Sequence, residues 1–162
     1  MRKTISYLII IMAVGVVIFN ACARREAIAL PSDIAARLAA EMRMPRGVLV
    51  TDENSADTGQ LIYTLMGDDF NPGMFDGYAV YPPVVNNTAA EFGILKVKDA
   101  SKIADAEKLI SRRIEKVRKS FDYKLSEKYE IRTHGRYIFY SIASDTDNGK
   151  VFGIIHEMLN DK

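Results

Sequence analysis

Three carboxylates, Asp69, Asp76 and Glu91, flank an aromatic-rich loop over residues 70–81 and are the best candidates for acid-base chemistry in this chain. Two carboxylates that face each other across a cleft can hydrolyse a glycosidic bond, one as the acid and the other as base or nucleophile. Sequence spacing does not place these three opposite one another. The signatures Gly-x-x-x-x-Gly-Lys-Ser and Gly-x-Ser-x-Gly are absent. We therefore expect no enzymatic activity and keep a hydrolase that uses these carboxylates as an alternative.

The loop over residues 70–81 offers a different chemistry through its rings, Phe70, Phe75, Tyr78 and Tyr81. Aromatic side chains that gather on a surface can stack against a sugar or a peptide. A ligand-binding subunit is the second alternative function.

The sequence offers no ligand set for a soft metal. Cys22 is the only cysteine, and the two histidines, His134 and His156, have no partner at metal-binding spacing. The segment 145–149 resembles the start of a calcium loop, but Gly149 stands at the fifth position and His156 at the twelfth, where the loop needs oxygen ligands. We interpret it as a helix cap and expect neither a metal nor a cofactor.

A basic stripe is expected on a long helix, where Lys108, Arg112, Lys116 and Lys119 recur at helical steps opposite its apolar side, with Arg113 and Arg118 on the flanks. Near a membrane, such a stripe can contact anionic head groups or a polyanion. The simpler interpretation is a solvated face that Asp105 and Glu115 partly compensate. The whole chain has 22 basic and 21 acidic residues, a balance that is not typical of a nucleic-acid-binding protein.

The N-terminus has the features of an export signal. Two basic residues precede an apolar run over residues 5–19, and Cys22 follows it directly after Ala21. We interpret residues 1–21 as a lipoprotein-type signal peptide, Cys22 as the lipid-attachment site, residues 22–31 as a tether and residues 32–162 as one domain. An uncleaved membrane anchor is the alternative, because the segment over residues 5–23 is just long enough to cross a bilayer. Both interpretations place the domain on the extracytoplasmic side of the cell membrane.

Hydrophobic periodicity predicts the elements of the domain. Apolar residues at three- and four-residue steps predict a long helix from about Ile103 to Phe121, a first helix after Ser32 and a last helix after Asp147. Strands are expected at residues 78–81, 92–98, 129–133 and 136–143, and the last of these has two apolar faces and is expected to be central. Residues 51–59 and 67–77 are expected to be loops, and residues 61–66 fit either a strand or a helical turn.

The order helix, two strands, long helix, two strands, helix indicates an α+β fold. A four-stranded antiparallel sheet with the helices packed on one face would bury both the sheet face and the helix stripes. The two halves resemble copies of one strand-strand-helix unit, with little identity between them.

Several segments resemble a small bacterial lipoprotein family known as domain of unknown function 4358. The resemblance rests on the run 93–99, on the end of the long helix at residues 120–123 and on the returning run 135–139. It implies an exported, membrane-tethered domain and no catalytic residues. The expected function is thus a non-catalytic binding or scaffolding domain at the cell envelope, held at the membrane and open to an envelope protein or polyanion, with no nucleic acid involved.

Overall fold

The computed structural model describes residues 29–42, 48–82, 91–120 and 128–160. Within these ranges the elements are α2 (Pro31–Glu41), β1 (Val50–Thr51), α3 (Ser55–Met66), the short 3-10 helix η1 (Pro72–Met74), β2 (Phe75–Tyr81), β3 (Glu91–Val97), the 3-10 helix η2 (Ala100–Lys102), α4 (Ile103–Ser120), β4 (Tyr129–His134), β5 (Tyr137–Ile142) and α6 (Asp145–Asn160).

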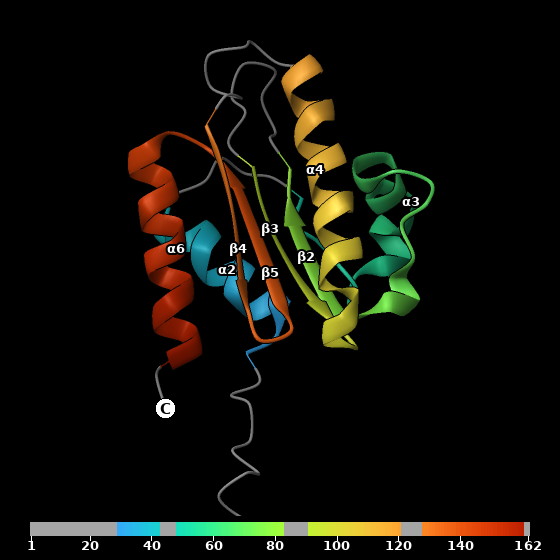
Figure 1. Ribbon diagram of the computed structural model, residues 1–162, viewed down its shortest axis with the longest axis horizontal. Coiled ribbons are helices and arrows are strands. Elements are labelled where there is room, and N and C mark those ends of the chain that lie inside the picture. The colour runs from blue at the N-terminus through green and yellow to red at the C-terminus, as the bar shows by residue number, and fades with distance from the viewer. Residues whose placement is uncertain (1–28, 43–47, 83–90, 121–127, 161–162) are drawn as a thin grey trace, which may run out of the picture.

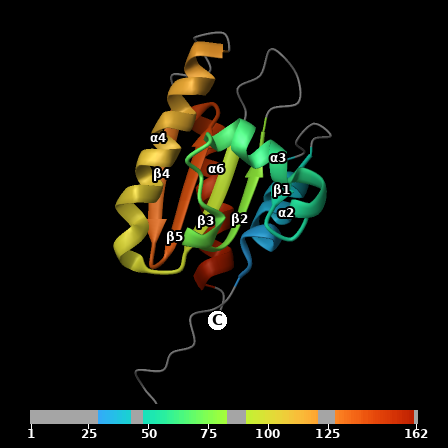
Figure 2. The same ribbon diagram turned by 90° about the vertical axis from the view of Figure 1, so that its right-hand side faces the viewer.

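The strands form one antiparallel sheet in the order β1-β2-β3-β5-β4. β3 and β5 are central, and each of their residues is buried, because helices cover both faces of the sheet. Figures 1 and 2 show α4 and α3 on one side of the sheet and α6 and α2 on the other. The expectation that the strand at residues 136–143 is central is confirmed.

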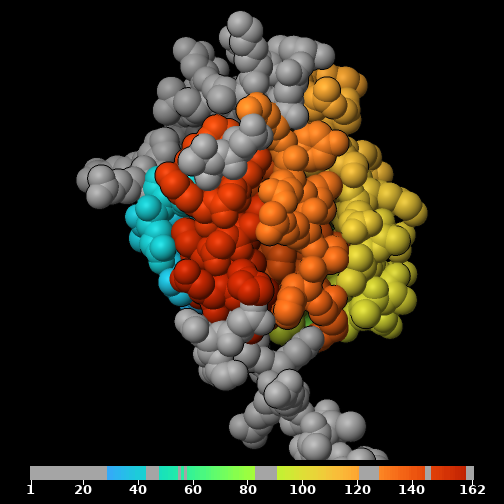
Figure 3. Space-filling view, turned by 60° about the vertical axis from the view of Figure 1, so that its left-hand side comes forward, coloured from blue at the N-terminus to red at the C-terminus, as the bar shows by residue number. Residues whose placement is uncertain are grey.

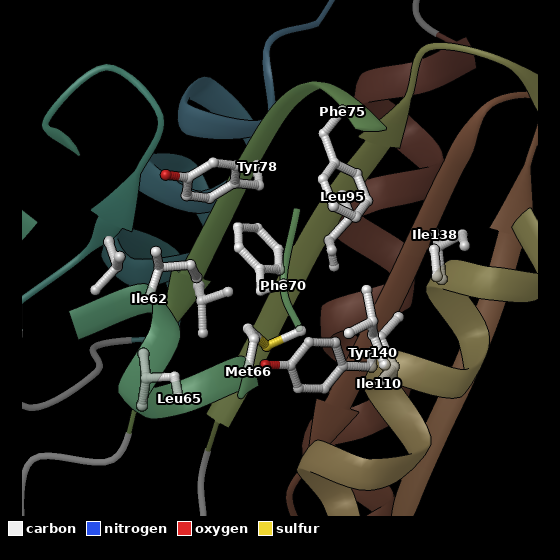
Figure 4. Close-up of a cluster of buried hydrophobic side chains, with 14 of the residues drawn as sticks. Ile62, Leu65, Met66, Phe70, Phe75, Tyr78, Leu95, Ile110, Ile138 and Tyr140 are labelled. Carbon is white, nitrogen blue, oxygen red and sulfur yellow. The ribbon is translucent and has the colours of Figure 1, made fainter. Parts of the chain in front are cut away.

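The α4 face of the sheet contains the larger of two hydrophobic clusters. Leu95 and Val97 of β3 and Ile138 and Ile142 of β5 point to this side, where they meet the buried stripe of α4 and the side chains of α3. Figure 4 shows this cluster, with Ile110 of α4 beside Ile138 and Tyr140. The predicted apolar stripe of the long helix is the buried one.

The opposite face forms a second cluster. Phe92 and Ile94 of β3 point to the face opposite Leu95 and Val97. There they meet Tyr137 and Phe139 of β5 under α2 and α6. Arg37 of α2 and Glu157 of α6 form an ion pair that joins the two helices at the surface. Along β3 and β5 alike, successive side chains therefore enter different cores, as the two-residue period of a strand requires.

The edges of the sheet are short or charged. β1 has two residues, and β4 has exposed or half-buried side chains throughout, among them Glu130 and Arg132, which form an ion pair. Figure 3 shows β4 at the surface between α6 and α4. Charged side chains on an edge strand oppose pairing with another sheet.

The α+β class and the antiparallel sheet are confirmed, and three details of the prediction need correction. The sheet has five strands, because β1 pairs with the outer side of β2. Helices pack on both faces, not one. Residues 55–66 form α3, where the sequence analysis expected a loop followed by an undecided run; the polar start of this helix and Gly59 within it obscured its period.

The interpretation of two copied units is also wrong in its geometry. Rotating the β2-β3 hairpin about the sheet normal onto the β4-β5 hairpin superposes the strands, since β3 and β5 are antiparallel neighbours. The same rotation leaves the helices on opposite faces, since α4 packs on one cluster and α6 on the other. The two strand-strand-helix units therefore have opposite hand.

Candidate functional site

A buried ion pair joins β3 to α4 in the interior of the α4 face. Arg113 donates from Nε to Glu91 Oε1 at 2.8 Å and from Nη2 to Glu91 Oε2 at 2.6 Å. Tyr140 of β5 donates its hydroxyl to Glu91 Oε1 at 2.7 Å. The Glu91 side chain is 0% exposed and that of Arg113 is 7% exposed. The two-pronged arginine contact and the phenol engage both carboxylate oxygens.

Gly93 makes room for this arrangement. It lies directly opposite Tyr140 in the β3-β5 register, and a Cβ atom at position 93 would stand 2.1 Å from Tyr140 Cε1. The Tyr140 ring therefore crosses the β3 backbone where only a glycine leaves space. This crossing allows its hydroxyl to reach Glu91 at the start of the strand.

The electrostatics of the cluster keep both Tyr140 and Arg113 protonated. Burial raises the pKa of Tyr140 well above its ordinary value, and the charge of Glu91 raises it further. Burial lowers the pKa of Arg113, but its hydrogen bond to Glu91 and the charge of that carboxylate outweigh this effect, so the net pKa is raised. Tyr140 thus stays a hydroxyl donor and Arg113 stays a cation, which suits a structural link between β3, β5 and α4.

The other two candidate carboxylates are also bound to arginines. Asp69 pairs with Arg112 of α4, and Asp76 pairs with Arg136. Arg136 also donates to the carbonyl oxygens of Val97 at 3.3 Å and Lys98 at 3.1 Å. Asp69, Asp76 and Glu91 are thus bound by three different arginines.

The basic stripe of α4 is largely engaged with the protein. Lys108 pairs with Asp105 within the helix, and Arg112 pairs with Asp69 after α3. Lys116 donates from Nζ to the carbonyl oxygen of Thr64 at 2.6 Å. Lys119 is exposed.

Two of the α4 cations cap the C-terminus of α3. The last turn of α3 has no basic residue of its own, and the last carbonyl groups of a helix lack partners within it. Lys116 bonds to Thr64 O, and Arg113 Nη1 reaches Leu65 O at 3.4 Å. Cations are also favoured at the negative end of the helix dipole. The stripe thus holds α3 against α4, a role that the sequence analysis did not predict.

The sequence did carry a signal for the buried pair. Arg113 follows Ile110 by three residues and precedes Val117 by four, so it lies within the apolar stripe and not on its flank. A cation at such a position requires a buried partner. Glu91 has the same phase as Leu95 and Val97 in β3, which places it on the same face of the sheet.

The four rings of the expected aromatic loop are buried. Phe70, Phe75 and Tyr78 join the cluster on the α4 face, where Phe70 stacks on Phe75 and meets Tyr78 edge-on. Tyr81 joins the opposite cluster and stacks on Phe92. The loop does not form the exposed aromatic patch that the sequence analysis considered for stacking a sugar.

A surface hollow of about 210 Å³ lies between α3 and β2. Asp52, Tyr63, Phe75 and Tyr78 contribute to its wall, and Gly59 of α3 lies beside it. Asp52 Oδ1 accepts a hydrogen bond from the backbone N–H of Tyr78 at 3.1 Å, which fixes the carboxylate. Burial raises the pKa of the Tyr78 hydroxyl, and the nearby charge of Asp52 raises it further. Sequence reasoning missed this site, because it depends on α3.

The described residues bear on metal binding and on membrane insertion. Within those ranges, no three His, Cys, Asp or Glu side chains are grouped closely enough to hold a metal ion. None of the helices there has the length and hydropathy of a membrane span. Cys22, the predicted signal peptide and most of the predicted tether lie outside these ranges. Ala29, the first described residue, accepts a hydrogen bond from the Tyr137 hydroxyl at 2.7 Å.

Together, the fold and these contacts define an α+β domain with a two-sided antiparallel sheet and an internal arginine–glutamate link. Residues 53–143, more than half of the 162-residue chain, match the family model described as Domain of unknown function (DUF4358), and the chain belongs to this family. The match runs from just before α3 to just after β5, so α2 and α6 lie outside it. No curated protein and no solved structure matches the chain.

Proposed function

We propose that this protein is an exported lipoprotein, anchored by lipid at Cys22, whose domain is a non-catalytic binding module on the extracytoplasmic side of the cell membrane. The anchor is supported by the basic start, the apolar run over residues 5–19 and the cysteine that follows it. The hydrogen bond from Tyr137 to Ala29 ties the last part of the proposed tether to the end of the sheet at which β5 starts.

The observation that favours binding over hydrolysis is the state of the carboxylates. Glu91 is enclosed, with both of its oxygens bonded, and Asp69 and Asp76 are each paired with an arginine. A general acid or base needs a free approach to the proton that it transfers. The hollow beside Asp52 is instead a concave site with a polar group and apolar walls, as ligand sites commonly have.

Metabolic labelling with a clickable fatty-acid analogue tests the anchor. Labelling of the full-length chain in a bacterial host is expected, and Cys22→Ala is expected to abolish it. Cys22→Ser is the matched control, because it keeps a nucleophilic oxygen of similar size but lacks the thiol. Labelling that is unchanged in Cys22→Ala would exclude Cys22 as the attachment site and would favour the uncleaved anchor.

Contact with an anionic surface through the basic stripe is a further part of the proposal. Because Lys116 bonds to the end of α3 and Arg112 pairs with Asp69 just after it, replacing them would test folding as well as binding. Lys108 and Lys119 are exposed and suit the test better. Vesicles with anionic lipid are expected to bind the wild-type chain more strongly than Lys108→Glu/Lys119→Glu, and equal binding would remove the stripe from the proposal.

A further inference from the structure

The hollow between α3 and β2 has the size of a site for a small ligand. Its volume is about 210 Å³, and a water molecule in the liquid takes up roughly 30 Å³, so it has room for about seven waters. A ligand of this size has on the order of five to ten non-hydrogen atoms. Ile62 and Pro72 add apolar surface to the wall. Such a space favours a short aliphatic group over a whole sugar chain or a long peptide.

The charge of the wall has one sign. Asp52 is an acid, and none of the described residues that line the hollow is Lys, Arg or His. Asp52 is exposed, while the backbone N–H of Tyr78 holds its Oδ1 in a fixed position. An anionic ligand would meet the negative charge of Asp52 here, whereas a cationic ligand would complement it.

The rings of the wall add a second preference for a cation. Tyr63, Phe75 and Tyr78 all line the hollow, and aromatic faces attract ammonium groups within about 6 Å. Figure 4 shows the Tyr78 hydroxyl pointing away from Phe75, toward the side of the sheet where β1 lies. Aromatic rings gathered around a site recognise quaternary ammonium groups in other proteins, and a carboxylate adds an attractive charge for any ammonium group.

We infer that the hollow formed by Asp52, Tyr63, Phe75 and Tyr78 binds a short alkylammonium group, with Asp52 as its counter-ion and the rings around its aliphatic part. This inference rests on the proposed binding function and names the chemistry of the ligand. The ammonium belongs either to a free amine or to a lysine-type side chain of a peptide, since both carry the same group on a short aliphatic stem.

Two-dimensional NMR of the tyrosine rings tests the inference in the full-length chain in an uncharged detergent. n-Butylammonium is expected to shift the signals of Tyr63 and Tyr78 in a saturable way. n-Butanol, which lacks the charge, and n-butyrate, which reverses it, are expected to bind at least about tenfold more weakly, a difference of about 1.4 kcal/mol. Equal saturation by n-butanol and n-butylammonium would overturn the ammonium assignment.

Two variants address the wall directly. Asp52→Asn keeps an oxygen that can accept from Tyr78 N–H and removes the charge, so the affinity for n-butylammonium is expected to fall about tenfold. Gly59→Leu is expected to abolish binding, because a Cβ at position 59 meets no atom within 4 Å and the side chain can occupy the hollow. Gly149→Leu on α6 is the matched control, since a Cβ there is equally unobstructed. Undiminished binding by either hollow variant would overturn the inference.

The remaining measurements distinguish a free amine from a peptide as the source of the ammonium group. They also distinguish failure of the ammonium assignment from failure of the proposed binding function. Tighter binding of N-acetyl-lysinamide than of n-butylammonium assigns the group to a peptide, and the reverse assigns it to a free amine. Saturable binding of n-butanol alone would leave the binding function standing without an ammonium. Absence of saturable shifts with every probe would remove the hollow as the ligand site, whereas the lipid anchor is decided by the Cys22 labelling alone.

Discussion

Glu91 is a fully buried carboxylate, and its charge is stabilised by the hydrogen-bond donors around it. Arg113 supplies two of these donors and Tyr140 a third. Removing an ion from water costs several kcal/mol, which only well-placed hydrogen bonds recover. The cluster therefore depends on the exact position of the Tyr140 ring, and that position depends on the absence of a side chain at Gly93.

Gly93→Ala is predicted to destabilise the domain by about 3 kcal/mol, because the added Cβ would stand 2.1 Å from Tyr140 Cε1 and force the ring and its hydroxyl away from Glu91. Urea denaturation followed by circular dichroism measures the free energy of unfolding. Gly149→Ala is the matched control and is expected to be neutral or stabilising, since its Cβ meets no atom and alanine favours a helix.

A double-mutant cycle identifies the cause. In a Tyr140→Ala background, which is itself destabilised, the further step Gly93→Ala is expected to cost less than 1 kcal/mol, because the clashing ring is gone. The same cost in both backgrounds would mean that the β3 backbone, and not the ring, requires the glycine.

At the scale of elements, α3 is held by contacts that come from α4. Its own end has no basic side chain, and the carbonyl oxygens of Thr64 and Leu65 receive their donors from Lys116 and Arg113. One wall of the proposed ligand hollow consists of α3 side chains. The long helix thus acts on the hollow indirectly, by fixing the helix that borders it.

Lys116→Met is predicted to loosen α3 locally with a small loss of global stability, about 0.5–1 kcal/mol, because the Thr64 carbonyl loses a charged donor at an exposed site. Amide hydrogen exchange is expected to accelerate in α3 and to stay unchanged in α6. Lys108→Met is the matched control, since Lys108 pairs with Asp105 on its own helix. Faster exchange in α3 in both variants would contradict a specific capping role for Lys116.

At the scale of the whole molecule, the two-sided sheet explains which parts of the fold were predictable. In β3, α4 and β5 the apolar residues recur with a strong period, and all three elements were predicted from the sequence. The apolar residues on both faces of β5 also indicated helices on both faces, but a one-sided sheet was expected because the sequence does not show that α4 and α6 pack on opposite faces. Without α3, the hollow beside Asp52 had no second wall.

The candidate sites, like the fold, were predictable in part from the sequence. That Arg113 lies in the apolar stripe of α4 could be inferred from its spacing, but its partner could not, since Glu91 precedes it by 22 residues and the pairing depends on how α4 lies across the sheet. The sequence left open whether Asp69 and Asp76 face one another, and in the structure each is held by a separate arginine. Local periods determine which face a side chain occupies, while the packing of the elements determines what it meets there.

Two buried phenols, Tyr78 and Tyr140, make the stability of the whole domain sensitive to alkaline pH. Burial is the largest cause of the raised pKa of each hydroxyl, and nearby carboxylate charges add to it. In the unfolded chain a tyrosine loses its proton near pH 10. Above that pH the folded state binds more protons than the unfolded state, so the free energy of unfolding falls as the pH rises. The contribution is fully present below pH 10.

Tyr140→Phe is therefore predicted to be less stable than the wild type at pH 8, by about 2 kcal/mol for the lost hydrogen bond to a carboxylate, and to lose less stability between pH 9.5 and pH 11. Urea denaturation at a series of pH values measures both effects. Tyr129→Phe is the control for the loss of a phenol hydroxyl, because Tyr129 is 46% exposed and its replacement is expected to leave the stability at pH 8 unchanged. A profile of Tyr140→Phe that runs parallel to the wild type across this range would show that the Tyr140 hydroxyl titrates alike in the folded and unfolded chains, and the closed link between Glu91, Arg113 and Tyr140 would then be wrong.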